Sequence, residues 1–490
     1  MTELDQIWRT GPAERAAAPR HEERPAWSDR LVEAGALFLL VFTPLAFGTV
    51  DPWAEAVAEL VVLGMLLAWA VKMVQDWEVR IELPPGWLPG LLFLGLVGLQ
   101  VVPLPLDWLA SLSPLAAEQA RQAALTAGDA PGLGTLSASP HDTRRLALKL
   151  GAVAAFFLVC YNTYRTRAQV RRALWTMVAM GALLSVFAIA QRMTWNDHFY
   201  WVGPLAPTRH AFGPFANRAH FAGLMAVIVP VALALLFAAR RRGSSREQLV
   251  RTWRDRLRLW NSQEGSAAGV LPWLVLLMAG AALVSGSRGG MIALLVSVMT
   301  MVGLGLRVSS RAWRLAGVAA ALALVMLAAA WIGGEVLYGT AERLAEEVED
   351  YGESPRLRIW EDAIALWRDA PILGTGLGTF EWAFARVRTL PGSKVYTHAE
   401  SDWVQLLTDT GLAGIALIML ALGLLGASLL RCRQRSSRIS MQRTLALGAL
   451  VAVIGAVIQA IPNFNLVVMS NLLYAALPAS IVLARERAEG

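Results

Sequence analysis

Apolar stretches recur along almost the whole chain and are separated by polar connections. A run of about 20 apolar residues is what one α-helix needs to cross the hydrocarbon core of a bilayer. The pattern predicts about twelve membrane-spanning helices, at residues 31–50, 54–74, 86–106, 144–162, 172–193, 211–239, 269–286, 289–306, 315–333, 401–430, 444–461 and 464–484. An even number of spans places both termini on the same side of the membrane.

Lysine and arginine gather in alternate connections between these runs. Most of the 44 lie in the N-terminal tail, at 72–80, 165–172, 240–258, 307–314 and 431–443, or at the C-terminus. Short basic connections are retained on the cytoplasmic side of a membrane, so we expect both termini in the cytoplasm. The opposite side then carries the longer connections, which are residues 107–143, 194–210 and 334–400.

The composition agrees with this picture and excludes a soluble enzyme with a single anchor. Of 490 residues, 56% are hydrophobic and 17% are charged, and the mean hydropathy is +0.48. The net charge of +7 follows from the basic connections, which are a topology signal, so we expect no nucleic-acid partner. Neither Cys160, inside an apolar run, nor Cys432, in a basic connection, indicates a disulfide or a metal site.

We therefore predict an all-α polytopic membrane protein with four parts. They are a flexible cytoplasmic tail at 1–30, spans one to nine at 31–333, a helical extracytoplasmic loop at 334–400, and the last three spans with a short tail at 401–490. The polar tail makes the first run an uncleaved span rather than a signal peptide.

The loop 334–400 contains helix signals of its own. Ser354 followed by Pro355 predicts a helix start, and Pro371 predicts its end. Between them an apolar stripe recurs at helical spacing, formed by Leu357, Trp360, Ile364 and Trp367. We expect that stripe to lie on the membrane face or to cover a cavity. A turn at Gly374, Gly376 and Gly378 and a second short helix from Phe380 to Val387 follow.

The segment from Thr397 to Asp402 is the first candidate for chemistry. His398 lies at the mouth of a long apolar run, together with Glu400 and Asp402. Histidine titrates near neutrality and can take a proton from a substrate hydroxyl. Either acid could orient the ring or raise its basicity, which makes His398 and Glu400 candidate catalytic residues. The alternative is a polar cap at the membrane interface.

Arg288 is the second candidate, because it lies in Ser285–Gly290 between two apolar runs with almost no connection. An arginine there must be paired or face water. Its planar guanidinium suits phosphate, and the neighbouring glycines allow close approach to a ligand. The alternative is that Arg288 reaches to lipid headgroups.

Three further groups are candidate phosphate ligands. Arg209, Asn217 and Arg218 precede or begin the sixth span, where a helix N-terminus favours anions. Interfacial anchoring is the alternative there. Arg358 lies on the predicted loop helix, where an ion pair with Asp362 would also explain it.

Nucleotide and metal motifs are not found in the sequence. It contains no P-loop, HExxH, CxxC or Asp-x-Asp pattern. We therefore expect no cofactor and no metal, with arginine neutralising any phosphate on the substrate.

Several short motifs, in this order, resemble the O-antigen ligase and polymerase family of bacterial membrane proteins. They are Phe47–Trp53, Arg209–Asn217, Ser285–Gly290, Arg358–Trp360 with Pro371–Gly378, and His398–Trp403 running into Leu406–Gly414. The motifs span most of the chain. Many family members have His-x-His-Asn or His-Asn before the tenth span. This chain has His398-Ala399-Glu400-Ser401-Asp402, which leaves the role of Glu400 and the acceptor open.

The resemblance implies a fold, a reaction and partners. The fold would have twelve spans, a large periplasmic loop after the ninth, and a place in the bacterial inner membrane. The reaction would be metal-independent transfer of a glycan from undecaprenyl diphosphate to an acceptor hydroxyl. The acceptor would be lipid A-core or another glycan or protein, and membrane lipids would surround the chain. By position, His398 matches the family's loop histidine, and Arg209 and Arg288 match its diphosphate-binding arginines.

Three functions remain open at this stage. A ligase would join a finished polysaccharide to its acceptor, and a polymerase would join lipid-linked repeat units. A transporter or flippase of lipid-linked sugars would place charge at mid-membrane depth, whereas the charged candidates here gather at the outer face.

Overall fold

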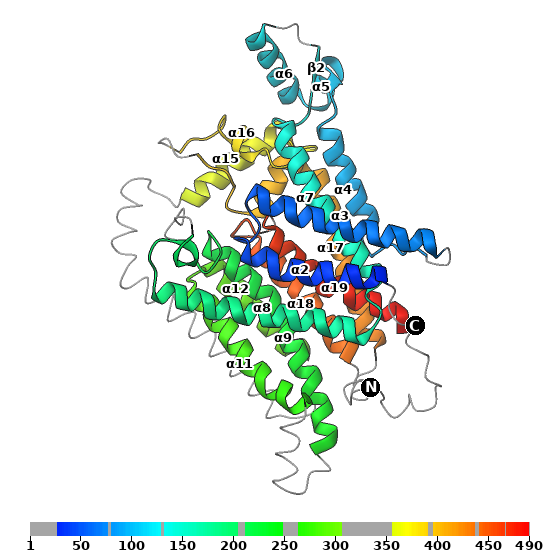
Figure 1. The fold of residues 1–490 in the computed structure, drawn as a ribbon. Coiled ribbons are helices and arrows are strands. Elements are labelled where there is room, and N and C mark those ends of the chain that lie inside the picture. The colour runs from blue at the N-terminus through cyan, green and yellow to red at the C-terminus, as the bar shows by residue number, and fades with distance from the viewer. Residues whose placement is uncertain are drawn as a thin grey trace.

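The computed structural model describes residues 27–76, 80–128, 132–203, 211–247, 263–305, 355–390, 395–436, 441–465 and 467–489. This part of the chain is almost entirely helical (Figure 1). Its one sheet pairs the two-residue strands β1 (Leu104–Pro105) and β2 (Leu133–Gly134) in antiparallel fashion. Six of the described helices are long and apolar enough to cross a membrane. The prediction of an all-α polytopic membrane protein is confirmed.

The predicted spans coincide with helices wherever the structure describes them. The helices are α2 (Trp27–Leu45), α3 (Pro52–Gln75), α4 (Trp87–Gln100), α7 (Pro140–Thr163), α8 (Arg167–Met193), α9 (Arg218–Glu247), α11 (Gln263–Val284), α12 (Arg288–Gly305), α17 (Asp402–Arg435), α18 (Met441–Gln459) and α19 (Met469–Glu489). The predicted ninth span, 315–333, lies outside the described residues.

Four predicted span boundaries were wrong by five residues or more at the end of the bundle where the candidate residues lie. The first span was expected to end at 50 and the third at 106, but α2 ends at Leu45 and α4 at Gln100. The sixth span was expected from residue 211, but α9 begins at Arg218, because Phe212 and Phe215 exchange backbone hydrogen bonds in a tight turn. The twelfth span was expected from 464, but α19 begins at Met469. Residues 460–465 form a loop there, and because four of the six are apolar, the hydrophobicity pattern did not reveal it.

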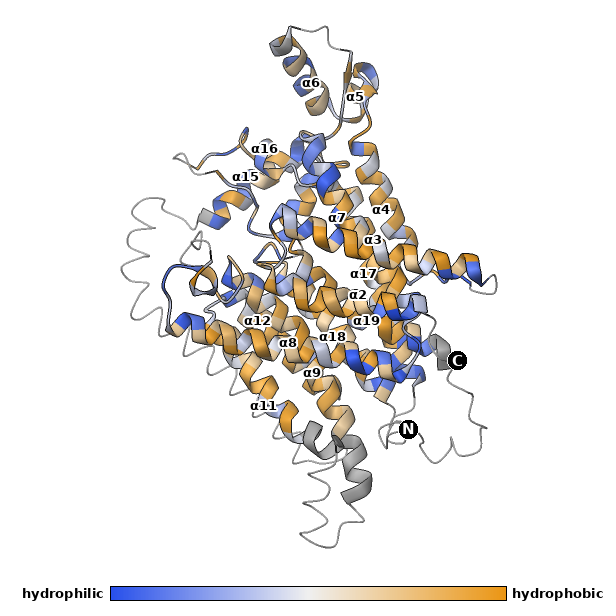
Figure 2. Cartoon of the chain, in the orientation of Figure 1, coloured by the Kyte–Doolittle hydropathy of each residue, from blue (hydrophilic) through white to orange (hydrophobic). Residues whose placement is uncertain are grey.

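Helix α9 is the central helix of the bundle. Its apolar window is 94% buried, whereas that of α17 is 17% buried. Helices α11, α12 and α18 pack directly against α9, partly through small residues such as Gly290 against Ala222. Small residues allow close helix packing in membranes. Figure 2 shows apolar residues along the middle of the bundle helices and polar residues gathered toward their ends.

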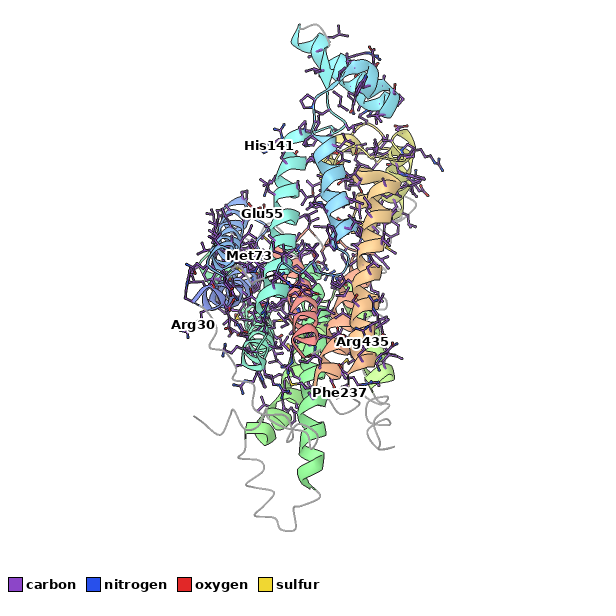
Figure 3. All side chains as sticks on the ribbon, turned by 90° about the vertical axis from the view of Figure 1, so that its right-hand side faces the viewer. Arg30, Glu55, Met73, His141, Phe237 and Arg435 are labelled. Carbon is purple, nitrogen blue, oxygen red and sulfur yellow. The ribbon has the colours of Figure 1, made fainter. Side chains whose placement is uncertain are left out.

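Two ion pairs connect helix ends at the end of the bundle where most basic residues lie. Lys72, near the end of α3, contacts Asp29 at the start of α2 at 2.7 Å. Arg435 at the end of α17 lies 3.9 Å from Glu486 on the last turns of α19. These contacts bring together the helix ends that carry the basic residues. Figure 3 places the labelled Arg30 and Arg435 toward this end, and Glu55 and His141 toward the other.

Two small helical units cover the other end. The first consists of β1, β2, α5 (Leu106–Leu112) and α6 (Pro114–Ala127), and it projects beyond α4 and α7 (Figure 1). The second consists of α15 (Pro355–Asp369) and α16 (Phe380–Phe384). The helix predicted in this loop is confirmed at both of its bounds.

The apolar stripe predicted on α15 is not the row of side chains that this helix packs against protein. The side chains that α15 buries are Ile359, Ala363 and Leu366, whereas Leu357 is 52% exposed. The buried set packs against Phe380 and Phe384 of α16. Two apolar rows run along this helix, and periodicity alone could not say which of them meets a partner.

The backbone of residues 371–378 supplies hydrogen-bond partners at a break in α17. Gly411 has φ 63° and ψ −166°, so it cannot continue the α-helical hydrogen bonding. Leu412 N donates to Pro371 O at 2.9 Å, and Gly376 N donates to Asp409 O at 3.0 Å. A broken helix at membrane depth needs such partners, because lipid offers no hydrogen bonds. The motifs Pro371–Gly378 and Leu406–Gly414 therefore pack together through backbone hydrogen bonds and form one structural unit.

We expect Gly374→Ala to destabilise the protein by several kcal/mol. Gly374 has φ +71°, and a Cβ there would collide with the Asp409 carbonyl and Thr410 N. Left-handed backbone alone costs a non-glycine residue about 1–2 kcal/mol. Thermal unfolding in detergent measures the loss. The matched control is Gly423→Ala on α17, where no atom lies within 4 Å of the new methyl. Equal unfolding temperatures for the two variants would contradict the close packing of residues 371–378 against the break in α17.

Candidate functional site

The loop Ala460–Asn465, here called the α18–α19 loop, joins the start of α17 to the start of α12. Asp402 N donates to Ala460 O at 3.0 Å and to Asn463 O at 3.1 Å. On the other side, Gly289 of α12 approaches Pro462 so closely that a Cβ on Gly289 would lie 2.6 Å from Pro462 Cγ. His398 and Arg288, which are 110 positions apart in the sequence, therefore lie beside the same six-residue loop.

His398 is held by a ring and an amide. Its imidazole stacks on Phe464 of the α18–α19 loop, with ring centroids 4.3 Å apart and an interplanar angle of 25°. Its Nδ1 lies 3.3 Å from Gln405 Oε1. Burial lowers the pKa of His398, the positive charge of Lys149 lowers it further, and the Gln405 contact opposes both. The ring is therefore biased toward its neutral form near pH 7.

The Gln405 contact also selects the tautomer of His398. Ala399 N donates to Gln405 Oε1 at 3.4 Å, which sets that atom as the amide oxygen. An amide oxygen only accepts, so the ring proton of neutral His398 lies on Nδ1. The lone pair is then on Nε2, which is the arrangement that a general base requires.

The segment that carries His398 is fixed by α15. Trp360 Nε1 donates to Ala399 O at 2.9 Å, and Ser401 caps α17 by accepting from Val404 N. Glu400 adopts a left-handed φ of 55°, and its carboxylate lies 3.4 Å from Arg356. The acid expected beside His398 thus points to α15, and the polar side chain that reaches the ring is Gln405.

A partly buried cluster with two cations and one carboxylate lies close to His398. Lys149 and Arg145 of α7 both pair with Glu55 of α3, the latter at 2.8 Å. Lys149 Nζ also donates to Val467 O at 3.1 Å, just after the α18–α19 loop. Because Lys149 and Glu55 are both almost fully buried, the cluster ties α3 and α7 to this loop and brings positive charge toward the histidine ring.

Arg288 is the first residue of α12 and its side chain is exposed. Ser287 caps the helix, because its Oγ accepts from Gly290 N at 3.2 Å. No ion pair to Arg288 is found within the described part of the chain. Its guanidinium is therefore presented to the space outside the protein at the end of the bundle where His398 lies.

Of the remaining predicted residues, three lie within the described part of the chain and one lies outside it. Asn217 accepts from Ala219 N at 2.9 Å and so helps to start α9, whose first residue is Arg218. Arg358 is exposed on α15, while Asp362 accepts hydrogen bonds from Thr389. Arg209 lies outside the described residues.

His220 completes the contacts around Phe464. Its ring meets Phe464 edge to face at 5.1 Å, so Phe464 lies between two histidines. His220 is 6% exposed, and its Nε2 has no hydrogen-bond partner within the described residues.

Sequence reasoning missed Gln405 and the whole α18–α19 loop. Gln405 lay inside an apolar run, and the loop was assigned to the ends of two spans. One signal was present in the sequence: Asn463 and Asn465 stand close together at the mouth of the last apolar run. Polar side chains at such a boundary are a functional hypothesis by default.

The helical architecture defines a multi-pass membrane protein, and its candidate residues lie at one rim of the bundle. Residues 273–419 match the model of the O-antigen ligase family. Comparison with curated proteins gives no match. The matched region runs from α11 through Arg288, α15, α16 and His398 into α17.

The match agrees with the resemblance drawn from the sequence motifs, and residues 273–419 are similar to the O-antigen ligase family over this stretch. It supports glycosyl transfer of the O-antigen ligase or polymerase type, acting on a lipid-linked glycan donor and an acceptor.

Proposed function

We propose that this protein transfers a glycan from undecaprenyl diphosphate to an acceptor hydroxyl, without a metal ion, at the periplasmic face of the bacterial inner membrane. The observation that carries the proposal is the α18–α19 loop, which has His398 on one side and the exposed Arg288 on the other. A base and a phosphate-binding cation are the two groups that this transfer needs.

In the proposed reaction, His398 Nε2 takes the proton of the acceptor hydroxyl. The hydroxyl oxygen then forms a bond to the anomeric carbon of the donor sugar. The bond from that carbon to the diphosphate oxygen breaks, and undecaprenyl diphosphate leaves with its charge. Arg288 and Arg209 stabilise that charge, with Arg358, Arg218 and Asn217 as further candidate ligands. Guanidinium groups suit this task, because they remain charged and bind phosphate through two N–H groups.

Purified protein in proteoliposomes tests the proposal. With an undecaprenyl-diphosphate-linked glycan and a lipid A-core acceptor, we expect a joined product that EDTA does not suppress. If no joined product forms with any hydroxyl acceptor, the proposal is wrong. Deleting the gene separates the two reaction types: a ligase leaves full-length glycan unattached, whereas a polymerase leaves single repeat units.

Cysteine labelling tests which end faces the periplasm. Leu357, on α15, is 52% exposed, and the Arg435 side chain at the opposite end is 76% exposed. An impermeant maleimide added to spheroplasts should label Leu357→Cys and spare Arg435→Cys. Labelling in the reverse order would invert the orientation.

Two substitutions of Gln405 should separate its effect on His398 from a packing effect. Gln405→Leu removes the acceptor of the Nδ1 proton, and we expect a fall in kcat of about tenfold. Gln405→Glu places a carboxylate at the ring, which raises the pKa of His398. Since only the neutral ring can act as a base, the acid limb of the kcat–pH profile should then move to higher pH. A profile that stays in place would exclude Gln405 as the residue that positions the base.

A further inference from the structure

The N-terminus of α12 is only partly closed by protein groups. Ser287 Oγ accepts from Gly290 N at 3.2 Å, and Ser287 O accepts from Met291 N at 2.9 Å. Among the described residues, the backbone N–H groups of Arg288 and Gly289 have no acceptor. Unfilled N–H groups at the start of a helix favour anions, both through hydrogen bonds and through the helix dipole.

An amide from the α18–α19 loop lies next to this helix start. A Cβ on Gly289 would collide with Asn463 Nδ2, so the amide nitrogen lies directly against the second residue of α12. Asn463 is 6% exposed, and its Nδ2 has no partner within the described residues. A buried donor without a partner is costly, so such a group is retained where a ligand completes it.

The loop that carries this amide is fixed rather than loose. Asn463 O accepts from Asp402 N at 3.1 Å, which ties it to the start of α17. The next residue, Phe464, supports the ring of His398. A ligand at Asn463 would therefore be held at a set position relative to the base.

We infer that Asn463 Nδ2, the N–H groups of Arg288 and Gly289, and the Arg288 guanidinium form one binding site for a phosphate group of the donor's diphosphate. This inference rests on the function proposed above. All of these groups donate hydrogen bonds, and each phosphate of the donor's diphosphate offers two non-bridging oxygens that accept them. Gly289 is required there because any side chain would displace Asn463.

The inference is tested by binding of undecaprenyl diphosphate to the full-length protein in nanodiscs, without acceptor or turnover. Asn463→Leu removes the donor at similar volume. We expect it to weaken binding by about ten- to a hundredfold, as for a hydrogen bond to a charged group. Because the variant also removes an unpaired buried amide, its unfolding temperature should be unchanged or higher. A residue with only a structural role would lower stability along with binding.

Asn463→Asp and Asn196→Asp form a matched pair. Asn196 is exposed before α9. An aspartate there keeps the acceptor for His198 N and loses the exposed hydrogen bond that Asn196 Nδ2 donates to Trp201 O at 2.8 Å. We expect Asn463→Asp to repel the diphosphate and Asn196→Asp to bind as the wild type does. Wild-type affinity in both Asn463 variants, while Arg288→Ala still weakens binding, would overturn the role of Asn463 alone.

Phosphatidylglycerol serves as the second probe, because a lipid headgroup carries the same phosphate chemistry. We expect it to compete weakly and to be insensitive to Asn463→Leu. If the wild type binds phosphatidylglycerol as tightly as undecaprenyl diphosphate, the site is a headgroup site. That result would overturn the donor assignment and the proposed function with it.

Discussion

Replacing His398 with alanine should reduce glycan transfer by about 10²–10⁴-fold, the usual contribution of a general base. The reason is that Nε2 is the one ring atom left with a lone pair once Gln405 has set the tautomer. The rate of joined-product formation in proteoliposomes measures the effect. Full activity in His398→Ala would remove the catalytic assignment.

His398→Phe controls for structure, because a phenyl ring can still stack on Phe464 but cannot take a proton. We expect it to unfold at about the wild-type temperature and to remain inactive. His141→Ala changes another histidine at the same end of the bundle, one that is exposed at the start of α7, and it should leave the rate unchanged. If His398→Phe were active, the ring would serve only for packing.

The pH dependence of the wild type follows from the same contacts. Burial lowers the pKa of His398 below its ordinary value. Since the neutral ring is the active form, kcat should persist below the pH at which an exposed histidine becomes protonated, and it should fall only at more acidic pH. An acid limb above the ordinary histidine value would contradict this environment.

Arg288→Lys should lower kcat/KM by about 10²–10³-fold, the cost of losing one preorganised donor to developing charge. Lysine keeps the positive charge but not the planar pair of N–H groups that fits a phosphate. We expect Arg288→Lys to resemble Arg288→Ala more than the wild type. The measurement is a kinetic series in donor concentration, with acceptor saturating.

Arg121→Lys on α6 is the control, because Arg121 makes only an exposed pair with Glu118 at 3.8 Å. Such pairs contribute about 0–1 kcal/mol, and the variant should behave as the wild type does. Normal turnover in Arg288→Lys would show that charge alone suffices, and the two-point phosphate contact would then be wrong.

Much of the fold could be read from the sequence because the bilayer imposes a simple rule. Each apolar run had to be a helix, and the structure places a helix at every run that it describes. The helix at Pro355–Asp369 was equally local, since proline begins it and a second proline follows its end. The boundaries failed where a loop consists mostly of apolar residues, as at residues 460–465.

Only part of the candidate site could be predicted from the sequence. Arg288 and His398 were singled out because charge at a membrane boundary is costly, and that argument needs no structure. Glu400 was chosen as the partner of His398 by proximity in sequence. A left-handed φ at Glu400 turns its carboxylate to Arg356, and Gln405 reaches the ring from the first turns of α17.

The sequence by itself determined the class of fold, the placement of the spans and the charged residues at the rim, because hydrophobic length and charge act locally along a chain. Tertiary structure alone decided which residues meet. Asn463 contacts Gly289, next to Arg288, and Phe464 contacts His398, because the starts of α12 and α17 and the end of α18 lie at the same level of the bundle. Contacts between segments so far apart in sequence depend on helix packing, and no local pattern encodes them.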